Sequence, residues 1–584
     1  MSAPASRAGA WPIIRAYWVS PDSGPGWRLL AAVIALDLAL VWRAARITYW
    51  QKDFYDTLQK MDEAAFWPLL AMLVLLALTG LVLSTARTWL AQSLEMRWRA
   101  WMTDVYLKRW LAGSAFWRLE REQHPAGCSV ENVDQRLAED LRMLASDTLS
   151  LSLGLLSNFV SLFTFSAIVW SMSGVLSITL GGASFEVPGY MLWVALIYAA
   201  GGSWLMEKIG GRMVAIDYRQ QQAEADFRTA LMRIRESAEQ IALYGGGHAE
   251  HARLTALFDA VKHNWRDIMV YTKRITITDN AYTEAGALVP YVLQGPRVLK
   301  GIITMGDLIQ LTQSFMRVRV ALSWFIYKYK SLALLRSALA RLAEFDAALQ
   351  AASGATASAP RITRQRGPAA SGYALQGVQA LGPGGRPLTP VVNWRIAPGE
   401  RWMLRGPSGA GKSTLLRALA GLWTHGHGHI ATPPGTAEAP GTATPPGAAA
   451  APRAETLFVP QQSYLPIDTL RACLAYPALE TAFSDDDCQA ALRWACLPAL
   501  THRLHESAHW ARQLSPGEQQ RLAFARIWLH RPRWLFLDEA TSALDEETEE
   551  RLYTRLTRDL PGLTLVSIAH RSSLRRFHEH EMQL

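Results

Sequence analysis

The sequence predicts a multidomain protein: an all-α transmembrane domain of about six helices, followed by an α/β domain that contains a P-loop. Three observations carry this prediction. Uncharged stretches of membrane-spanning length crowd the first half of the chain. A short apolar strand, a glycine-rich loop and a leucine-rich helix follow one another between residues 402 and 419. A segment rich in Ala, Ser, Gly and Pro separates the two regions.

The predicted domain boundaries follow these changes in composition. Residues 1–26 are polar, contain no apolar run of the kind found in a signal peptide, and form an N-terminal cytoplasmic segment. Residues 27–349 form the transmembrane domain, 350–373 a linker and 374–584 the α/β domain. A low-complexity insertion at about 430–453 contains the string Thr-Pro-Pro-Gly twice.

Four stretches have the length and hydropathy of spanning helices, and two weaker ones bring the number to about six. The first holds Asp37, so either this residue faces the bundle interior or the helix extends to Trp50. The weaker pair contains Pro and Arg, and is either a pair of buried soluble helices or the lining of a polar path. The six are Leu29–Trp42, Ala64–Thr85, Leu149–Trp170, Val187–Met206, Ala285–Pro296 and Leu308–Tyr327.

Charge on the connecting segments predicts the orientation. Residues 91–147 carry eight Lys and Arg, residues 207–274 carry eleven, and residues 171–186 carry none. The two long basic segments are therefore predicted to be cytoplasmic, with the α/β domain on the same side. The connection 43–62, with four Lys and Arg, argues weakly for the reverse.

Composition bears on other classes of protein. The net charge of +9 is compatible with a nucleic-acid partner, but Lys and Arg on cytoplasmic loops produce the same balance. The spans between 148 and 206 argue against a soluble DNA-associated ATPase, so we predict no nucleic-acid partner. The cysteines at 128, 473, 488 and 496 lack CxxC spacing, which indicates neither a zinc site nor a disulfide framework.

The P-loop has the form G-x-x-x-x-G-K-[ST] in its strand–loop–helix context. Gly409 and Gly411 let the backbone bend, so that successive N–H groups cradle phosphate oxygens. Lys412 reaches the β- and γ-phosphates, and the Ser413 hydroxyl is placed to bind Mg²⁺. The predicted ATP-binding residues here are Gly406, Pro407, Ser408, Gly409, Ala410, Gly411, Lys412, Ser413 and Thr414.

Further motifs follow the P-loop in a fixed order. They are Val459-Pro460-Gln461, Leu514-Ser515-Pro516-Gly517-Glu518-Gln519-Gln520-Arg521, Leu535–Glu539, Ser542–Asp545 and Ile568-Ala569-His570-Arg571. From about 375 to 575 the chain thereby resembles the nucleotide-binding domain of ABC ATPases. In that family these motifs are the Q-loop, the signature, the Walker B motif, the D-loop and the switch histidine.

The resemblance implies a role for each residue. Asp538 would hold Mg²⁺ together with Ser413, and Gln461 would sense the ion and the attacking water. Glu539 is the candidate catalytic base, and His570 would contact the γ-phosphate. In the signature, Ser515, Gly517 and Glu518 would complete the ATP site of a second copy. One P-loop and one signature per chain imply a half transporter, with a homodimer as the simplest unit and a heterodimer as the alternative.

The chain departs from the family pattern at three positions, two in the signature and one before the P-loop. Pro516 stands where Gly is common and cannot donate a backbone N–H, and Glu518 stands where Gln is common. Gly382 occupies the position of the usual adenine-stacking aromatic residue.

A narrower resemblance covers residues 15 to 345. Asp134-Gln135-Arg136 with Glu139-Asp140, the string Ile241–Gly246 and Leu322-Ser323-Trp324 are similar to motifs of subfamily D transporters and SbmA/BacA-like transporters. This implies a six-helix, exporter-type membrane domain. The first two patches would lie at its membrane-distal tips and dock on the ATPase domain.

These observations predict a dimeric ABC transporter that couples ATP hydrolysis to movement of a solute across a bacterial cell (inner) membrane. A membrane-anchored regulatory ATPase and a proton-coupled transporter with Asp37 as proton carrier remain alternatives. Small molecules, lipid-like compounds such as acyl-CoAs, and peptides are all compatible as substrates, and the direction of transport is open.

Overall fold

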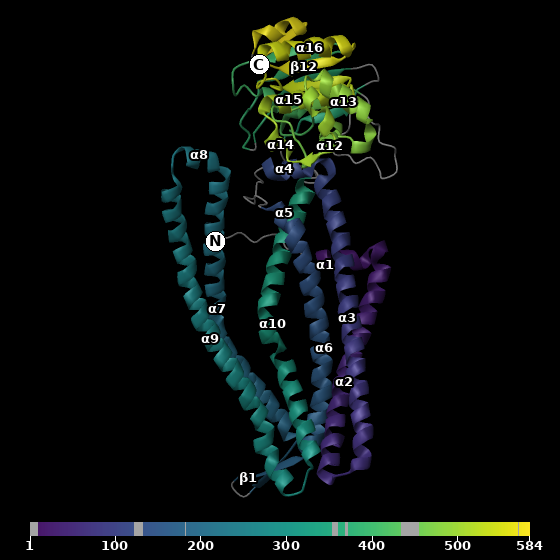
Figure 1. The fold of residues 1–584 in the computed structure, drawn as a ribbon, viewed down its shortest axis with the longest axis vertical. Coiled ribbons are helices and arrows are strands. Elements are labelled where there is room, and N and C mark those ends of the chain that lie inside the picture. Colours follow the sequence, from purple (N-terminus) through teal and green to yellow (C-terminus); the bar gives the residue numbers. More distant parts are fainter. Residues whose placement is uncertain are drawn as a thin grey trace. The chain divides into compact units, whose positions relative to one another are not determined.

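The computed structural model describes residues 10–121, 132–180, 183–352, 360–367, 372–382, 384–433, 455–569 and 571–584. The chain forms two compact units. The first comprises Met1–Thr103 and Asp134–Ala343, and the second comprises Asp104–Val133 and Glu344–Leu584. Long helices build the first unit, whereas strands and shorter helices make up most of the second (Figure 1).

Six long helices dominate the described part of the transmembrane domain, as the predicted fold class requires. Two segments, Glu63–Glu120 and Val133–Ser173, are long and apolar enough to cross a membrane by length and composition among the described residues. The helices are α2 (Gly24–Lys60), α3 (Glu63–Leu111), α6 (Leu141–Ser173), α7 (Tyr190–Glu236), α9 (Gly247–Leu299) and α10 (Met305–Ala352). Five of them contain a whole predicted span, whereas α7 starts at Tyr190, because the first residues of the predicted span Val187–Met206 belong to strand β2 (Ala183–Pro188).

Both expectations for Asp37 hold. Helix α2 continues through Trp50 to Lys60, so residues 43–60, predicted as part of a connecting loop, are helical. Asp37 is buried and pairs with Arg87 of α3 at 3.0 Å. The N-terminal segment is also partly helical, because α1 spans Ala10–Val19 and packs Tyr17 against Trp98.

The connections of the first unit are short. Strands β1 (Val175–Leu180) and β2 (Ala183–Pro188) form an antiparallel hairpin between α6 and α7; Gly181 and Gly182, where a turn was predicted, lie outside the described residues. At the other end, α8 (Ala238–Leu243) links α7 to α9, which pack side by side (Figure 1). As predicted, a helix ends at these glycines: Gly245 and Gly246 follow α8 and bond back to its last carbonyls, whereas Gly247 is the first residue of α9.

In the first patch predicted to dock on the ATPase domain, Arg136 and Asp140 bond a residue of their own unit. Helix α5 (Val133–Gln135) and a π-helical turn (Arg136–Asp140) open α6. Asp140 is buried and pairs with Arg341 of α10 at 2.5 Å, and Arg136 donates to the Arg341 carbonyl at 2.6 Å.

The second unit contains two larger sheets. Five parallel strands have the order β13-β6-β12-β11-β8, and a four-stranded sheet has the order β3-β7-β4-β5. Their bounds are β3 (Thr363–Arg366), β4 (Tyr373–Ala380), β5 (Val392–Ile396), β6 (Arg401–Arg405), β7 (Gly426–Thr432), β8 (Thr456–Val459), β11 (Trp534–Asp538), β12 (Thr564–Ile568) and β13 (His580–Gln583).

Two predicted boundaries need correction. Strand β3 lies within the predicted linker 350–373 and pairs with β7, and α10 extends three residues into that linker. Strand β7 runs to Thr432 and thus overlaps the start of the predicted insertion. Residues 434–454 of that region lie outside the described residues.

The helices of the second unit cover the parallel sheet and form a separate apolar cluster. Buried Leu, Ala and Cys side chains of α12, α13 and α15 make up that cluster around Trp510. The short helix α4 (Ala115–Arg121) belongs to this unit, and Trp117 meets Trp423 edge to face at 6.3 Å. The other helices are α11 (Lys412–Leu419), α12 (Leu470–Ala475), α13 (Asp485–Trp494), α14 (Trp510–Gln513), α15 (Pro516–His530) and α16 (Glu546–Asp559).

Candidate nucleotide-binding site

The P-loop connects β6 to α11. Strand β6 lies between β12 and β13, so the loop leaves the carboxyl edge of a parallel sheet, where such folds bind ligands. Gly409 and Gly411 have φ of +84° and +89°, a conformation that favours glycine. A side chain at Gly411 would also place its Cβ 2.3 Å from the carbonyl oxygen of Leu388.

The Lys412 side chain is 6% exposed and bends back onto the P-loop. Its Nζ donates to the carbonyl oxygens of Gly406 at 2.8 Å and Pro407 at 3.0 Å. These bonds hold the ammonium group at the P-loop, beside the amides that open α11. A cation and a helix N-terminus at one place form an anion site.

Two of the three residues predicted at the Mg²⁺ site, Ser413 and Asp538, meet across the sheet edge, whereas the third, Gln461, bonds Glu539. The Ser413 hydroxyl donates to Oδ1 of Asp538 at 2.9 Å. Burial raises the pKa of Asp538, and the hydrogen bond from Ser413 partly offsets this rise. One carboxylate and one hydroxyl fit Mg²⁺, which commonly takes its remaining ligands from phosphate and water. No group of three or more His, Cys, Asp or Glu side chains among the described residues forms a cage for a metal ion.

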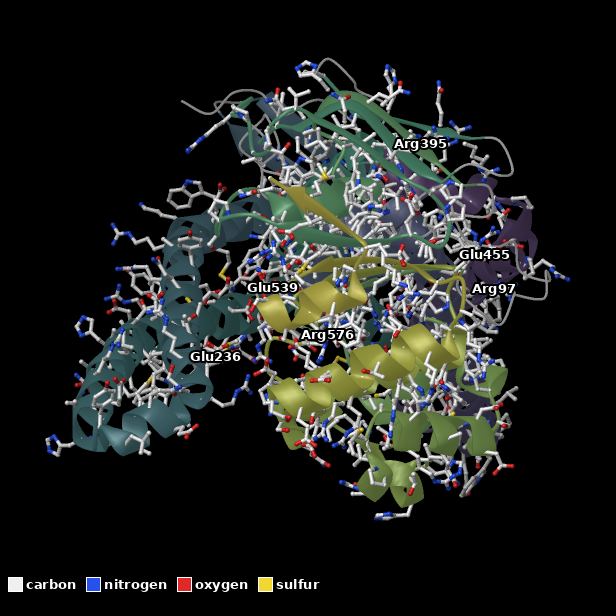
Figure 2. All side chains as sticks on the ribbon, turned by 90° about the horizontal axis from the view of Figure 1, so that it is seen from above. Arg97, Glu236, Arg395, Glu455, Glu539 and Arg576 are labelled. Atoms are coloured by element: carbon white, nitrogen blue, oxygen red, sulfur yellow. The ribbon has the colours of Figure 1, made fainter. Side chains whose placement is uncertain are left out.

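Glu539 and Gln461 also come together. Gln461 Nε2 donates to Oε2 of Glu539 at 3.2 Å. Glu539, which is labelled in Figure 2, follows β11 with φ of +50°. Its backbone N–H donates to the carbonyl oxygen of Ile568 at 3.1 Å. A left-handed conformation at a residue other than Gly is uncommon and is held here by the neighbouring strand. The carboxylate is thereby fixed next to Asp538.

His570 lies outside the described residues. Strand β12 ends two residues earlier, and its Ile568 lies opposite Asp538 in parallel register.

The signature forms the start of α15. Ser515 is the N-cap, and its hydroxyl accepts from the backbone N–H of Glu518 at 3.3 Å, while Glu518 accepts from the Ser515 N–H at 2.9 Å. The Ser515 hydroxyl also donates to Oε2 of Glu518 at 2.8 Å, and this bond, together with the one from the Ser515 N–H, lowers the pKa of Glu518. Pro516 sits at the first helical position, where the missing N–H costs nothing, which explains one departure from the family pattern.

The carboxylate of Glu518 therefore caps a helix, although it was predicted to bind nucleotide. Among the described hydrogen bonds of Ser515 and Glu518, none reaches the P-loop of the same chain. Gln520, which we did not single out from the sequence, ties this helix to the D-loop through Ser542 Oγ at 3.1 Å and the Ala543 N–H at 2.9 Å.

Arg526 is a second residue that sequence reasoning missed. It is 8% exposed and donates to the carbonyls of Cys473 at 2.6 Å and Tyr464 at 2.7 Å, so it links α15 to the segment after Gln461. Burial lowers its pKa to about 10. The available signal was a charged residue within the apolar run 522–529.

Gly382, at the position of the expected adenine-stacking residue, belongs to a tight turn. Its N–H bonds the Arg386 carbonyl at 2.7 Å, and its carbonyl accepts from the Gly385 N–H at 2.9 Å. Adenine stacking on a side chain at this position is therefore excluded.

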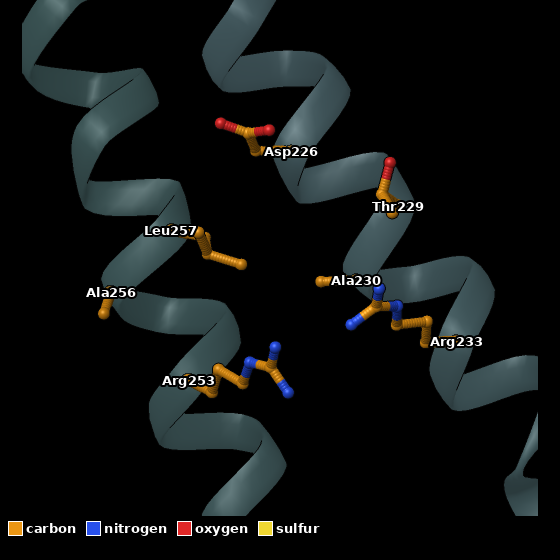
Figure 3. A pocket seen from close by; sticks show the side chains of 7 residues that line it. All are labelled: Asp226, Thr229, Ala230, Arg233, Arg253, Ala256 and Leu257. Atoms are coloured by element: carbon orange, nitrogen blue, oxygen red, sulfur yellow. The ribbon is translucent and has the colours of Figure 1, made fainter.

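A separate groove lies between α7 and α9, near α8. Arg233 and Arg253 extend into it from opposite helices, and Asp226 lies farther along α7 (Figure 3). The remaining lining residues are Thr229, Ala230, Ala256 and Leu257.

Comparisons with known families agree with the two units. Residues 13–299 match the family model for "ABC transporter transmembrane region 2", and residues 390–542 match the model for "ABC transporter".

Relatives align over nearly the whole chain. The Escherichia coli (strain K12) inner membrane ABC transporter ATP-binding protein YddA is 31% identical over 564 residues, which cover 96% of this chain and 94% of that protein. The chloroplastic ABC transporter D family member 2 of Arabidopsis thaliana is 29% identical over 97% of this chain and 84% of its own length. The human lysosomal cobalamin transporter ABCD4 is 26% identical over 96% and 92%.

The fold also matches a solved structure. A bacterial Atm1-family ABC exporter with ATP bound superposes with a TM-score of 0.67 at 18% sequence identity, covering 95% of this chain and 93% of the exporter chain.

Proposed function

Because the chain belongs to the ABC transporters that fuse a membrane domain to an ATP-binding ATPase domain, we propose that two copies form one transporter that moves a solute across a bacterial inner membrane. The observation that carries the proposal is the ATP site, in which Ser413 lies against Asp538 and Gln461 against Glu539. Helices of the same chain carry uncharged stretches of spanning length.

We assign each side chain of the site a role in hydrolysis. Lys412 and the P-loop amides bind the β- and γ-phosphates. Ser413 and Asp538 would hold Mg²⁺, which when bound neutralises charge on the phosphates. Glu539 accepts a proton from the attacking water, and Gln461 keeps the Glu539 carboxylate oriented. For His570, which lies outside the described residues, we propose contact with the γ-phosphate, as the resemblance to ABC ATPases implies.

The signature acts on the second copy. Ser515 and Gly517 at the start of α15 offer a hydroxyl, a backbone N–H and a helix N-terminus to the γ-phosphate bound by the partner. ATP then favours the closed dimer, since it contacts both copies only in that state.

Two features support coupling to the membrane helices. Helix α4, from the cytoplasmic connection between α3 and α6, packs Trp117 on Trp423, close behind α11 of the P-loop. Leu243 and Tyr244 at the end of α8 are 81% and 89% exposed and are available to a second copy. We propose that α4 and α8 transmit closure of the ATPase domains to the spanning helices.

The test is ATP turnover by purified protein in lipid nanodiscs. Glu539→Gln should lower turnover by about 100-fold or more while ATP binding persists, because the general base is lost. Glu546→Gln, an exposed position at the start of α16, is the matched control and should be neutral. Turnover of Glu539→Gln near that of the unmodified protein would refute the catalytic assignment.

Proton-coupled transport is the second candidate. Its proposed carrier, Asp37, is ion-paired with Arg87, an arrangement that favours a structural role. Substrate uptake into vesicles that requires hydrolysable ATP and is unaffected by a proton uncoupler would support the ATP-driven mechanism.

A further inference from the structure

Arg319 of α10 is a buried cation within the membrane domain. It is 6% exposed and lies within Leu308–Tyr327, one of the two weaker predicted spans. Arginine stays charged in proteins, and an ionisable residue at membrane depth is expensive unless it is paired. Among the described residues, no carboxylate forms an ion pair with Arg319.

The contacts that Arg319 does make are neutral. Nη1 donates to the hydroxyl of Thr283 on α9 at 3.3 Å, and the guanidinium lies 5.1 Å from the ring centroid of Tyr282. Its Nε is fully buried, and no acceptor among the described residues takes its hydrogen bond. One helical turn further on, Ser323 is also buried, and its hydroxyl and the Arg319 guanidinium both lie toward the hydroxyl of Tyr282.

Three helices build this place. Tyr198 of α7 stacks on Tyr282 of α9 with ring centroids 4.7 Å apart and planes 9° apart. Gly286 allows the approach of Arg319, because a Cβ there would lie 3.0 Å from the Tyr198 ring and 3.3 Å from Cδ of Arg319. A Cβ at Gly202 would lie 2.2 Å from the Tyr282 ring. Both glycines therefore make room for the aromatic pair beside the cation.

From this geometry we propose that Arg319, with Ser323 and the edge of the Tyr198–Tyr282 pair, binds an anionic group of the transported substrate, a carboxylate or a phosphate monoester. The planar guanidinium binds such groups through two N–H donors, and the free Nε supplies one of them. The anion removes the electrostatic cost of the buried cation. This inference rests on the proposed transport function, because it names the substrate class.

Direct binding to the full-length protein in phosphatidylcholine nanodiscs, without ATP, tests the inference. The probes are oleate, a carboxylate that partitions into the bilayer, and phenyl phosphate, which stays in water; methyl oleate and phenol are their neutral counterparts. We expect saturable binding of at least one anion, no matching binding of its neutral counterpart, and an affinity at least tenfold lower in Arg319→Gln. The anion that binds identifies the source of the ligand as bilayer or water.

Two further variants keep the test decisive. Arg319→Lys retains the charge without the planar fork and should bind more tightly than Arg319→Gln. Arg317→Gln removes an exposed arginine that lies 6.0 Å from the Phe165 ring, and should leave binding unchanged. Equal affinities of Arg319→Gln and the unmodified protein, equal losses in both glutamine variants, or no saturable binding of either anion would overturn the proposal. Because binding is measured without ATP, a failure of ATP-driven transport is recognised separately.

Discussion

At the residue scale, Asp538 is a side chain whose burial lowers the stability of the folded chain at a position proposed to bind Mg²⁺. Burial raises its pKa, so the folded chain binds a proton more readily than the unfolded chain. The ionised carboxylate therefore lowers the free energy of unfolding at pH values above the folded-state pKa, and this loss disappears below the unfolded-state pKa.

Asp538→Asn should accordingly raise the Tm of nucleotide-free protein at pH 7 while weakening Mg-ATP binding. The gain in Tm should shrink as the pH is lowered through the pKa of Asp538, because the native residue then becomes neutral as well. Thermal unfolding between pH 7 and pH 4 measures both effects. A lower Tm at pH 7 would show that the bond from Ser413 outweighs the cost of burial.

At the same scale, the sequence predicts which residues form the site better than it predicts which groups their side chains bond. The P-loop, Asp538 and Glu539 were predicted from local patterns, since strand, loop and helix signals flank them. The capping role of Glu518 and the buried Arg526 were not, because both depend on which backbone groups lack a partner after folding. Arg319 was noted only as an interruption of a span.

At the scale of the element, the first turn of α15 both caps its own helix and is proposed to bind the ATP of a second copy. Ser515 caps the helix through its hydroxyl and is also proposed to face a partner's phosphate. Ser515→Ala should lower the stability of the ATPase domain by about 1 kcal/mol, the usual cost of losing an N-cap. It should lower ATP turnover by more than this loss of stability explains.

The double variant Ser515→Ala/Glu518→Gln separates these two tasks. Because Ser515 and Glu518 bond reciprocally, the two stability changes should be less than additive. Chemical unfolding gives the stabilities, and turnover at saturating ATP gives the function. Additive stability changes would show that the capping box does not act as a unit.

At the scale of the element, helices α9 and α10 show where hydropathy alone does not predict a spanning helix. The weaker predicted spans form unbroken helices, with Pro290 and Pro296 inside α9. Their low hydropathy is explained by position, since the Pro290 and Arg319 side chains are buried among neighbouring helices. Periodicity within one segment cannot indicate which neighbour covers a polar side chain, so the sequence left open whether these stretches cross the membrane.

At the scale of the whole molecule, the proposed dimer has a specific consequence. Each ATP site would take its P-loop from one copy and its signature from the other. Lys412→Ala disables the P-loop. Gly517→Asp disables the signature, because the introduced carboxylate repels the γ-phosphate. Either variant alone should then have no intact site.

Co-expression of these two variants should restore turnover. In a mixed dimer both substitutions fall on one site, so the other site is intact. With random pairing, half of the dimers are mixed and each has one good site of two, which gives about a quarter of the unmodified turnover. As a control, the double variant Lys412→Ala/Gly517→Asp paired with the unmodified chain has one defect in each site, and such mixed dimers should be inactive. A mixture of the single variants no more active than either alone would contradict the head-to-tail arrangement, and with it the role proposed for Ser515 and Gly517.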